Sequence, residues 1–258
     1  LVNGTSMAIQ TYSNPGDSVV LFTPVYYVFF KQIKEGGREV LECPLVNNNG
    51  HYELDFEHYD KLMTGKEKVL VLSSPHNPGG RVWTKDELKG IASFADRHDL
   101  ILVSDEIHND LVMPNYKHIP MALAAPEVED RLIMMTSTTK TFNLAGMHTG
   151  NVIIPNETLR EKFNKTMVSY GISPNSFGKH MVAAAYCQEG ADWVDALMIY
   201  IAENQRIFNS SINSIPGVNS MELEGTYLCW VDFSNTGMQN QEVLNRVEKV
   251  AQIAISRG

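Results

Sequence analysis

Short, continuously apolar runs alternate along the first part of the chain with longer stretches in which apolar and polar residues mix. Such short runs predict strands that are covered by helices on both faces of a sheet. The predicted strands are Val19–Phe22, Val69–Leu72, Leu100–Val103, Leu132–Met135 and Val152–Ile154. Strands that alternate with helices indicate a mostly parallel sheet, so the pattern predicts an α/β fold with helices flanking that sheet.

Local signals predict the helices. Thr84-Lys85-Asp86-Glu87 has capping-box spacing, which predicts a helix that ends near His98. Beyond about Asn156 the pattern becomes mostly helical. Helices are predicted over Leu159–Tyr170, Gly178–Tyr186, Trp193 to about Ser214 and Gln241–Ser256, with one more strand over Gly225–Phe233. We therefore expect a large domain, residues 1–196, and part of a smaller α+β C-terminal domain, residues 197–258, with the boundary inside the long helix.

Composition narrows the classes of partner. The chain has 258 residues, of which 43% are hydrophobic, and its formal net charge is −9. An acidic chain is a poor match for nucleic acid or an anionic membrane surface, and no apolar stretch approaches the roughly 18 residues of a membrane span. Cys43, Cys187 and Cys229 are too far apart to predict a disulfide framework or a metal site, so we expect a reducing cytoplasm. The remaining expectation is a small-molecule partner.

The first residues carry neither an initiator Met nor a signal-peptide pattern. The sequence therefore resembles an excerpt that begins inside a longer chain.

Polar side chains follow three of the predicted strands, at the edge of an α/β sheet where ligands usually bind. These segments are Ser73-Ser74-Pro75-His76-Asn77-Pro78-Gly79-Gly80, Ser104-Asp105-Glu106-Ile107-His108 and Thr136-Ser137-Thr138-Thr139-Lys140. An amide, a carboxylate with an imidazole, and a lysine among hydroxyls are the groups that a pyridine aldehyde phosphate requires. The order of these groups indicates a cofactor site.

Each residue also has a simpler interpretation. Lys140 is typical of a solvated surface charge, although the hydroxyls of Ser137, Thr138 and Thr139 beside it can bind a phosphate. Asp105 is equally typical of a helix cap or a buried ion pair, whereas a carboxylate against a pyridine nitrogen keeps that nitrogen protonated. Asn77 has the sequence context of a turn, and His108 that of a buried structural histidine. Tyr26 and Tyr27 are typical of core packing, although one of them can stack on a pyridine ring.

Four ordered motifs resemble those of fold-type I pyridoxal-phosphate (PLP) enzymes in the class I/II aminotransferase superfamily. Within it, the chain most resembles the MalY/PatB group of cystathionine β-lyase-like carbon–sulfur lyases. The motifs are Thr23-Pro24-Val25-Tyr26-Tyr27, Ser74-Pro75-His76-Asn77-Pro78-Gly79-Gly80, Ser104-Asp105-Glu106-Ile107-His108 and Lys140-Thr141-Phe142-Asn143-Leu144-Ala145-Gly146. Glu224-Gly225-Thr226-Tyr227-Leu228 and Asn175-Ser176-Phe177-Gly178 also fit the resemblance, which covers essentially the whole chain.

The resemblance implies pyridoxal 5′-phosphate as the cofactor, a PLP-dependent transferase-like fold and a role for each matched residue. Lys140 would be the Schiff-base lysine, Asp105 would contact the pyridine nitrogen, and Tyr26 would stack on the ring. Asn77 would contact the O3′ oxygen, beside His108, which stands where aminotransferases usually keep a tyrosine. The phosphate contacts would come from Ser137, Thr139, His148, Leu1 and Val2.

The same resemblance implies a homodimer with sites at its interface. The family's phosphate-binding turn would lie just before Leu1, and its arginine for the substrate carboxylate would lie beyond Gly258.

We predict a PLP-dependent β-lyase that cleaves cystathionine or cysteine S-conjugates to a thiol, pyruvate and ammonia. Lys140 would be the base for the Cα proton and Asp105 would stabilise the negative charge that develops. The alternative is a class I/II aminotransferase, which shares the first steps. A non-catalytic PLP-binding or regulatory domain and an inactive fragment are further alternatives.

Overall fold

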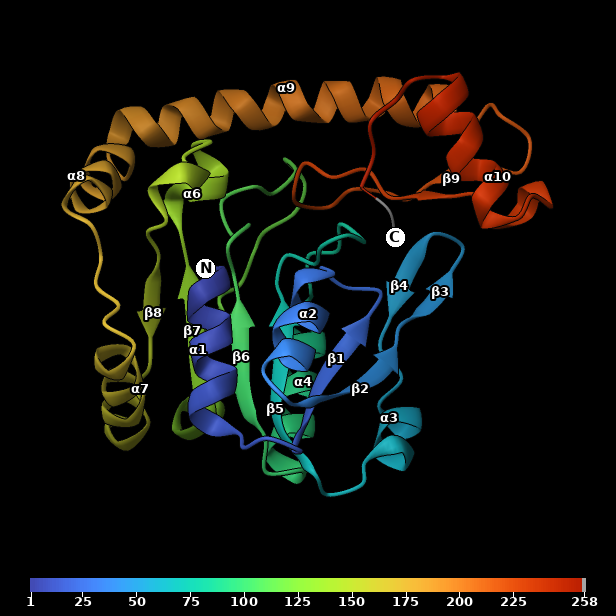
Figure 1. Ribbon diagram of the computed structural model, residues 1–258. Coiled ribbons are helices and arrows are strands. Elements are labelled where there is room, and N and C mark those ends of the chain that lie inside the picture. Colours follow the sequence, from blue (N-terminus) through green and yellow to red (C-terminus); the bar gives the residue numbers. More distant parts are fainter. Residues whose placement is uncertain (257–258) are drawn as a thin grey trace.

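A central sheet forms the middle layer of the protein (Figure 1). The computed structural model describes residues 1–256, and within them the sheet has six strands in the order β2-β1-β5-β6-β7-β8. The strands are β1 (Ser18–Thr23), β2 (Glu39–Pro44), β5 (Glu67–Ser73), β6 (Ile101–Asp105), β7 (Leu132–Thr136) and β8 (Asn151–Ile153). Neighbouring strands are parallel except β7 and β8, which are antiparallel, so the predicted mostly parallel sheet is confirmed.

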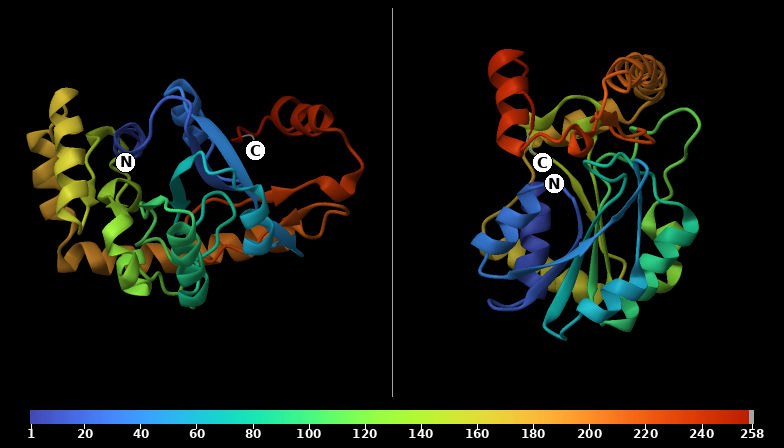
Figure 2. Two further views of the ribbon diagram at one scale, coloured as in Figure 1. Left: turned by 90° about the horizontal axis from the view of Figure 1, so that it is seen from below. Right: turned by 90° about the vertical axis from the view of Figure 1, so that its right-hand side faces the viewer.

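Helices cover both faces of this sheet, as the α/β pattern predicts (Figure 2). On one face lie α1 (Val2–Tyr12), α2 (Val28–Glu35) and α7 (Glu157–Ser169). On the other face lie α3 (Phe56–Leu62), α4 (Lys85–Arg97), α5 (Met121–Ala124) and the 3-10 turn η1 (Pro126–Arg131). Thr84 caps α4 with the predicted capping box, because its side chain accepts from Glu87 N while the Glu87 side chain accepts from Thr84 N.

The remaining elements are short hairpins, turns and the helices of the C-terminal part. They are β3 (Val46–Asn48), β4 (His51–Glu53), α6 (Thr138–Thr141), η2 (Ala145–Met147), α8 (Ser176–Ala185), α9 (Gln188–Ile212), β9 (Asn219–Ser220), β10 (Val231–Asp232), η3 (Ser234–Thr236), α10 (Asn240–Leu244) and the π-helical η4 (Asn245–Val250).

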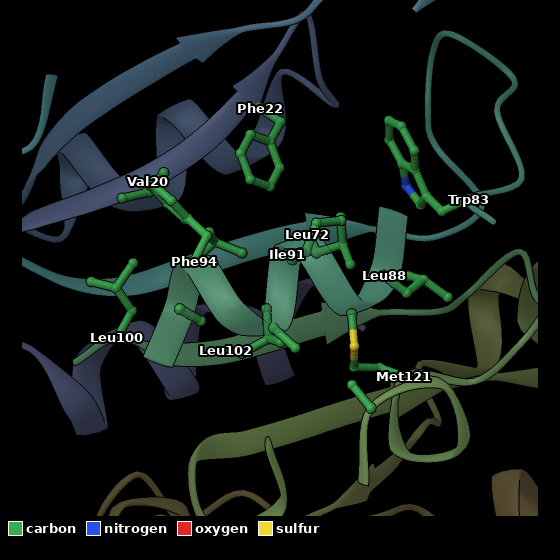
Figure 3. Packing of buried hydrophobic residues seen from close by; sticks show 14 of the residues in the cluster. Val20, Phe22, Leu72, Trp83, Leu88, Ile91, Phe94, Leu100, Leu102 and Met121 are labelled. Carbon is green, nitrogen blue, oxygen red and sulfur yellow. The ribbon is translucent and has the colours of Figure 1, made fainter. Parts of the chain in front are cut away.

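Alternation along the strands divides the apolar core into two layers. Successive side chains of a strand point to opposite faces. Leu70 and Leu102 therefore join the layer under α4, which Figure 3 shows in close-up, whereas Val71 and Val103 join the layer under α1. All four side chains are at most 1% exposed. The interior strands are consequently apolar on both faces, which explains their continuous runs in the sequence.

The carboxyl ends of β5, β6 and β7 lie at one edge of the sheet, and α9 runs along that edge (Figure 1). Met198 of α9 packs there against Leu111, Met113 and Leu223 in a small apolar cluster. The first turn of α1 reaches the same edge, below α6 (Figure 1). This arrangement gathers segments that are far apart in the sequence around three neighbouring strand ends.

Two predicted elements are wrong in extent. The predicted strand Gly225–Phe233 is a strand only over Val231–Asp232, because Thr226 has a positive φ of 72° that turns the backbone, and Gly225 forms only an isolated bridge with Val112. The predicted helix Gln241–Ser256 continues only to Val250, as α10 followed by η4. Gln252 has a φ of 56°, which no helix can continue.

The predicted division into residues 1–196 and 197–258 falls inside α9. It stays a prediction, and the last two residues of the second part lie outside the described residues. No helix among residues 1–256 has the length and apolar character needed to cross a membrane.

Candidate active site

Three strand ends bring the predicted site residues to one edge of the sheet. In the parallel register, Ser73 at the end of β5 lies beside Asp105 at the end of β6, and Asp105 lies beside Met135 of β7. Lys140 follows β7 on the short helix α6. Ser74 N donates to the Asp105 carbonyl oxygen (3.0 Å), which ties the first two strand ends together.

Asp105 is the buried carboxylate of this edge. It is 8% exposed, and its one hydrogen bond is from Ile107 N to Oδ1 (3.2 Å). Burial raises the pKa of Asp105 to about 6, against the lowering effects of the Leu1 amino group, the Ile107 N–H and Lys140. A carboxylate so poorly solvated favours a cationic partner. Its raised pKa therefore marks the position as a candidate functional site.

Lys140 lies on a helix of only four residues that hydrogen bonds hold at both ends. At its start, Ser137 Oγ accepts from Thr139 N (3.2 Å) and donates to the Thr149 carbonyl oxygen (2.7 Å). At its end, Thr141 Oγ1 donates to Asp110 Oδ2 (2.9 Å). The Lys140 side chain is half-buried and has no hydrogen bond or ion pair with any residue of the described chain. The backbone is thus fixed while the amino group is free to react.

His108 lies close to Lys140 and is buried. Its side chain is 2% exposed, and its Nδ1 has no hydrogen-bond partner within residues 1–256. Burial lowers the pKa of His108 to about 4, and the positive charge of Lys140 lowers it further. The imidazole is consequently neutral near pH 7 and can donate or accept a hydrogen bond.

Tyr26 and Tyr27 follow β1 at the same edge of the sheet. Tyr26 is half-buried and packs edge-on against Tyr27 and Phe29, with ring centroids 5.3 and 5.6 Å apart. Burial raises the pKa of Tyr26, and the nearby Tyr27, Asp105 and Tyr227 raise it further. Tyr26 therefore lies near Asp105.

Sequence reasoning missed Tyr227 as a site residue, although its segment Glu224–Leu228 fitted the family resemblance. The Tyr227 ring packs edge-on against His108 at 5.7 Å, and its hydroxyl is close enough to raise the pKa of Tyr26. The motif was the signal that could have found it. Tyr227 is therefore close to both His108 and Tyr26.

Asn77 occupies the loop after β5. Its backbone N–H donates to Ser73 Oγ (3.1 Å), which sets the loop over the strand end. The side-chain amide is half-buried and has no hydrogen bond to any described residue. The amide is therefore available to a ligand at the edge.

The residues that were predicted to contact the phosphate differ in their surroundings. Leu1 lies near Asp105 and Lys140, and an added Cβ on Gly150 would come within 2.4 Å of Leu1 Cδ2, so Leu1 also packs against the segment after η2. Val2 begins α1, whose first N–H groups have no partner inside the helix. His148, by contrast, is exposed, and its side chain has no hydrogen bond to a described residue.

The hydroxyl groups near Lys140 differ in whether they already have a hydrogen-bond partner. Those of Ser137 and Thr139 already bond to each other, at 2.8 Å. Thr138 Oγ1, which the predicted contacts did not include, is buried without a partner in residues 1–256. Thr138 is therefore the hydroxyl with unused hydrogen-bonding capacity.

These residues fit a PLP-like group. Buried polar atoms almost always have hydrogen-bond partners, so His108 Nδ1 and Thr138 Oγ1 call for a polar ligand. The poorly compensated Asp105 carboxylate suits a protonated ring nitrogen, and the free Lys140 amine suits an aldehyde. Tyr26 supplies an aromatic face.

Comparison with known proteins gives concordant results. The family model described as aminotransferase class I and II matches residues 2–257. The chain is 34% identical to cystathionine beta-lyase PatB of Bacillus subtilis (strain 168), covering 100% of this chain and 67% of that protein. It is 33% identical to Protein MalY of Escherichia coli (strain K12), covering 95% and 64%.

The solved structures agree. The crystal structure of cystalysin from Treponema denticola, which contains a pyridoxal 5′-phosphate cofactor, matches with a TM-score of 0.95 and 38% identity. The match covers 100% of this chain and 66% of cystalysin. The chain thus spans about two thirds of the length of the relatives that it matches.

Proposed function

This chain belongs to the aminotransferase class I and II family of PLP-dependent enzymes, and on that premise we propose that the protein is a carbon–sulfur β-lyase. Its proposed substrate is cystathionine or another cysteine S-conjugate. The Cα–H and Cβ–S bonds break, the sulfur leaves as a thiol, and water converts the remaining fragment to pyruvate and ammonia. The similarity to cystathionine beta-lyase PatB supports this reaction over others of the family.

Bound PLP supplies an electron sink for the negative charge that forms at the substrate Cα. The proposed role of Lys140 is first to hold the cofactor aldehyde covalently and then to take the Cα proton at Nζ. Its free, half-buried amine beside Asp105 is the single observation that carries the proposal. Asp105 would hold a proton on the pyridine nitrogen, because a buried carboxylate favours a cationic neighbour.

The other matched residues would bind and orient. Tyr26 would stack on the ring, and Asn77 and His108 would form hydrogen bonds to the O3′ oxygen. Leu1 and Val2, at the N-terminus of α1, suit the phosphate because a helix N-terminus attracts anions. We retain Ser137, Thr139 and His148 as proposed phosphate contacts and add Thr138, whose hydroxyl has no partner among the described residues.

A homodimer and a cytoplasmic location are part of the same proposal. They follow from the family resemblance and from the composition, and the sedimentation of the purified protein tests the first of them. The proposed substrate class is a small amino acid in either the lyase or the aminotransferase interpretation.

The second candidate is an aminotransferase, which the description of the family itself favours. Both reactions require removal of the Cα proton by Lys140, and a tenfold preference between their later steps needs only about 1.4 kcal/mol. A good leaving group at Cβ should direct the outcome toward elimination. The neutral His108 beside Lys140 is compatible with both.

The deciding experiment incubates the PLP-loaded protein with cystathionine and, separately, with an amino acid and a keto acid. We expect pyruvate, ammonia and free thiol in equal amounts, formed much faster than any amino transfer. Lys140→Ala is the matched control that should form none of them. If cystathionine gives no pyruvate while an amino acid converts the cofactor to its amine form, the aminotransferase proposal replaces the lyase.

A further inference from the structure

A second buried carboxylate follows Asp105 directly. Glu106 is 1% exposed, and its carboxylate has three partners. Oε1 accepts from Ser104 Oγ (2.9 Å) and from Met121 N (3.0 Å), while Oε2 lies 2.8 Å from His118 Nε2. The His118 side chain is itself 7% exposed. Glu106 thus has a complete set of contacts that the proposed chemistry does not use.

Glu106 and Asp105 lie on opposite sides of the sheet edge. Side chains alternate along β6, so Asp105 shares a face with Val103, in the layer under α1. Ser104 shares the other face with Leu102, and Met121 packs in that second layer too. The bonds of Glu106 to Ser104 and Met121 therefore hold its carboxylate behind Asp105, away from the proposed cofactor.

The charge of Glu106 also affects the pKa of Asp105. Two neighbouring buried carboxylates repel each other, and the negative charge of Glu106 raises the pKa of Asp105. The other charged or titratable groups that act on Asp105 are the Leu1 amino group, Lys140 and Tyr26. Among the described residues, only His118 pairs with Glu106 through a titratable group. His118, whose Nε2 lies 2.8 Å from Glu106 Oε2, is therefore the group placed to offset that charge.

The other side of the Glu106–His118 pair borders a cavity that is open to solvent. Together with Asn109, Asp110 and Met198, His118 lines this cavity of about 510 Å³ between the segment 109–120 and α9. His118 therefore connects the buried carboxylate to solvent.

We infer that Glu106 and His118 form a buried pair that positions Asp105, and that His118 offsets the Glu106 charge and so favours the anionic form of Asp105 for its proposed contact with the pyridine nitrogen. Both are positioning residues, because they act through Asp105 and touch neither substrate nor cofactor. The inference rests on the proposed function and adds to it the device that sets the charge of Asp105.

Two conservative substitutions should change Asp105 in opposite directions. Glu106→Gln keeps an oxygen for Ser104 and Met121 but removes the nearby negative charge, so the pKa of Asp105 should fall. His118→Gln leaves the Glu106 charge without its cation, so the pKa of Asp105 should rise. We expect shifts of about one unit each, the size that a close charge produces. A change that merely loosened the structure would not reverse sign between the two variants.

The measurement is the ¹³C carboxyl titration of Asp105 by NMR in the full chain without cofactor, assigned by its absence in Asp105→Asn. His98→Gln is the matched control, because His98, directly after α4, contacts Asp60 Oδ1 of α3 through Nε2 at 2.7 Å in a more exposed pair. It should leave the Asp105 titration unchanged. Shifts in the same direction, or none, would overturn the inference. If His118→Gln does not fold, the fall in Glu106→Gln is still required.

The loaded enzyme provides a second readout. The acid limb of the kcat/KM profile should move down in Glu106→Gln and up in His118→Gln, following the NMR titration. Near-normal turnover of Asp105→Asn would refute the proposed function and leave the ion pair intact. An inactive Asp105→Asn without the opposite shifts would refute the ion pair alone.

Discussion

The interior of the sheet and its carboxyl edge are consecutive parts of the same strands, yet they are built in opposite ways. In the interior, Leu70, Leu102 and Ile133 are fully buried apolar side chains that pack under helices. At the edge, a few residues further along, Asp105 is buried as a carboxylate and His108 Nδ1 has no partner within residues 1–256. The interior buries apolar side chains, whereas the edge buries polar groups, some of which lack partners among the described residues.

This difference separates a region that stabilises the fold from a region that is arranged to bind a ligand. A buried polar group without a partner costs about 1–3 kcal/mol, so the edge destabilises the protein without its cofactor. A ligand that satisfies those groups restores that free energy through binding. Departures from good packing rules concentrate at functional sites for this reason. Substitutions in the two regions should therefore have separable effects on stability and on turnover.

The largest effect is expected at the edge, from Lys140→Ala. Turnover should fall by at least about 10³-fold, or about 4 kcal/mol, because the proposed base is lost. The free energy of unfolding should change by less than about 0.5 kcal/mol, since the side chain has no bond to a described residue. Steady-state kinetics and urea unfolding measure the two quantities. Lys89→Ala, at an exposed position, is the control. Ordinary turnover of Lys140→Ala would contradict the proposed difference between the two regions.

The converse is expected in the interior, from Ile91→Ala. Ile91 is completely buried on α4, and removing its side-chain atoms should lower the free energy of unfolding by about 3 kcal/mol. Turnover of the folded enzyme should stay within about twofold, because Ile91 packs in a core layer that contains none of the proposed site residues. Ile91→Val should cost only about 1 kcal/mol. A selective loss of turnover with unchanged stability would show that the interior takes part in the chemistry.

A smaller effect of the opposite sign is expected from Asp105→Asn in the protein without cofactor. The pKa of Asp105 is about 6 in the folded state, above its unfolded value of about 3.9. The folded state therefore binds the proton more tightly, and this residue's contribution to stability is largest below about pH 4 and is lost as the pH rises through 6. Asparagine carries no charge, so the variant should be more stable than the native chain by about 2–3 kcal/mol at pH 7.5.

The pH dependence sharpens that test. The stability difference between Asp105→Asn and the native chain should shrink toward zero at pH 4, because both side chains are then neutral. Urea unfolding at several pH values measures it. Asp195→Asn changes an exposed carboxylate on α9 and should alter stability little at any pH. An Asp105→Asn chain that is less stable at pH 7.5 would mean that the carboxylate is a structural partner.

The interior was predictable from the sequence because its requirements are local. Each apolar run of β1, β5, β6 and β7 lies within two residues of the observed strand, since strands buried on both faces must be apolar throughout. The capping box of α4 could also be predicted from the sequence, because all its atoms lie within four residues. The strand end that holds Asp105 followed from the same runs.

Other parts could not be predicted because their conformation depends on distant contacts. The sequence of α1 contains Asn3, Gly4 and Thr5, which are weak helix formers, and burial against the sheet stabilises the helix instead. β2 mixes charged and apolar residues without alternation, as an edge strand with β1 as its only strand partner in the described sheet. The contact between Tyr227 and His108 joins residues more than one hundred positions apart. Motifs gave the candidate residues, but only the fold gave their partners.

Borohydride reduction of the PLP-loaded protein tests most directly the central claim that the carboxyl edge holds the cofactor through Lys140. Reduction turns the bond between the cofactor and a lysine into a stable secondary amine, which survives digestion and can be located by mass spectrometry. We predict that the cofactor mass is found on the peptide that contains Lys140 and is absent from it in Lys140→Ala. Attachment to any other lysine of the native chain would contradict the account.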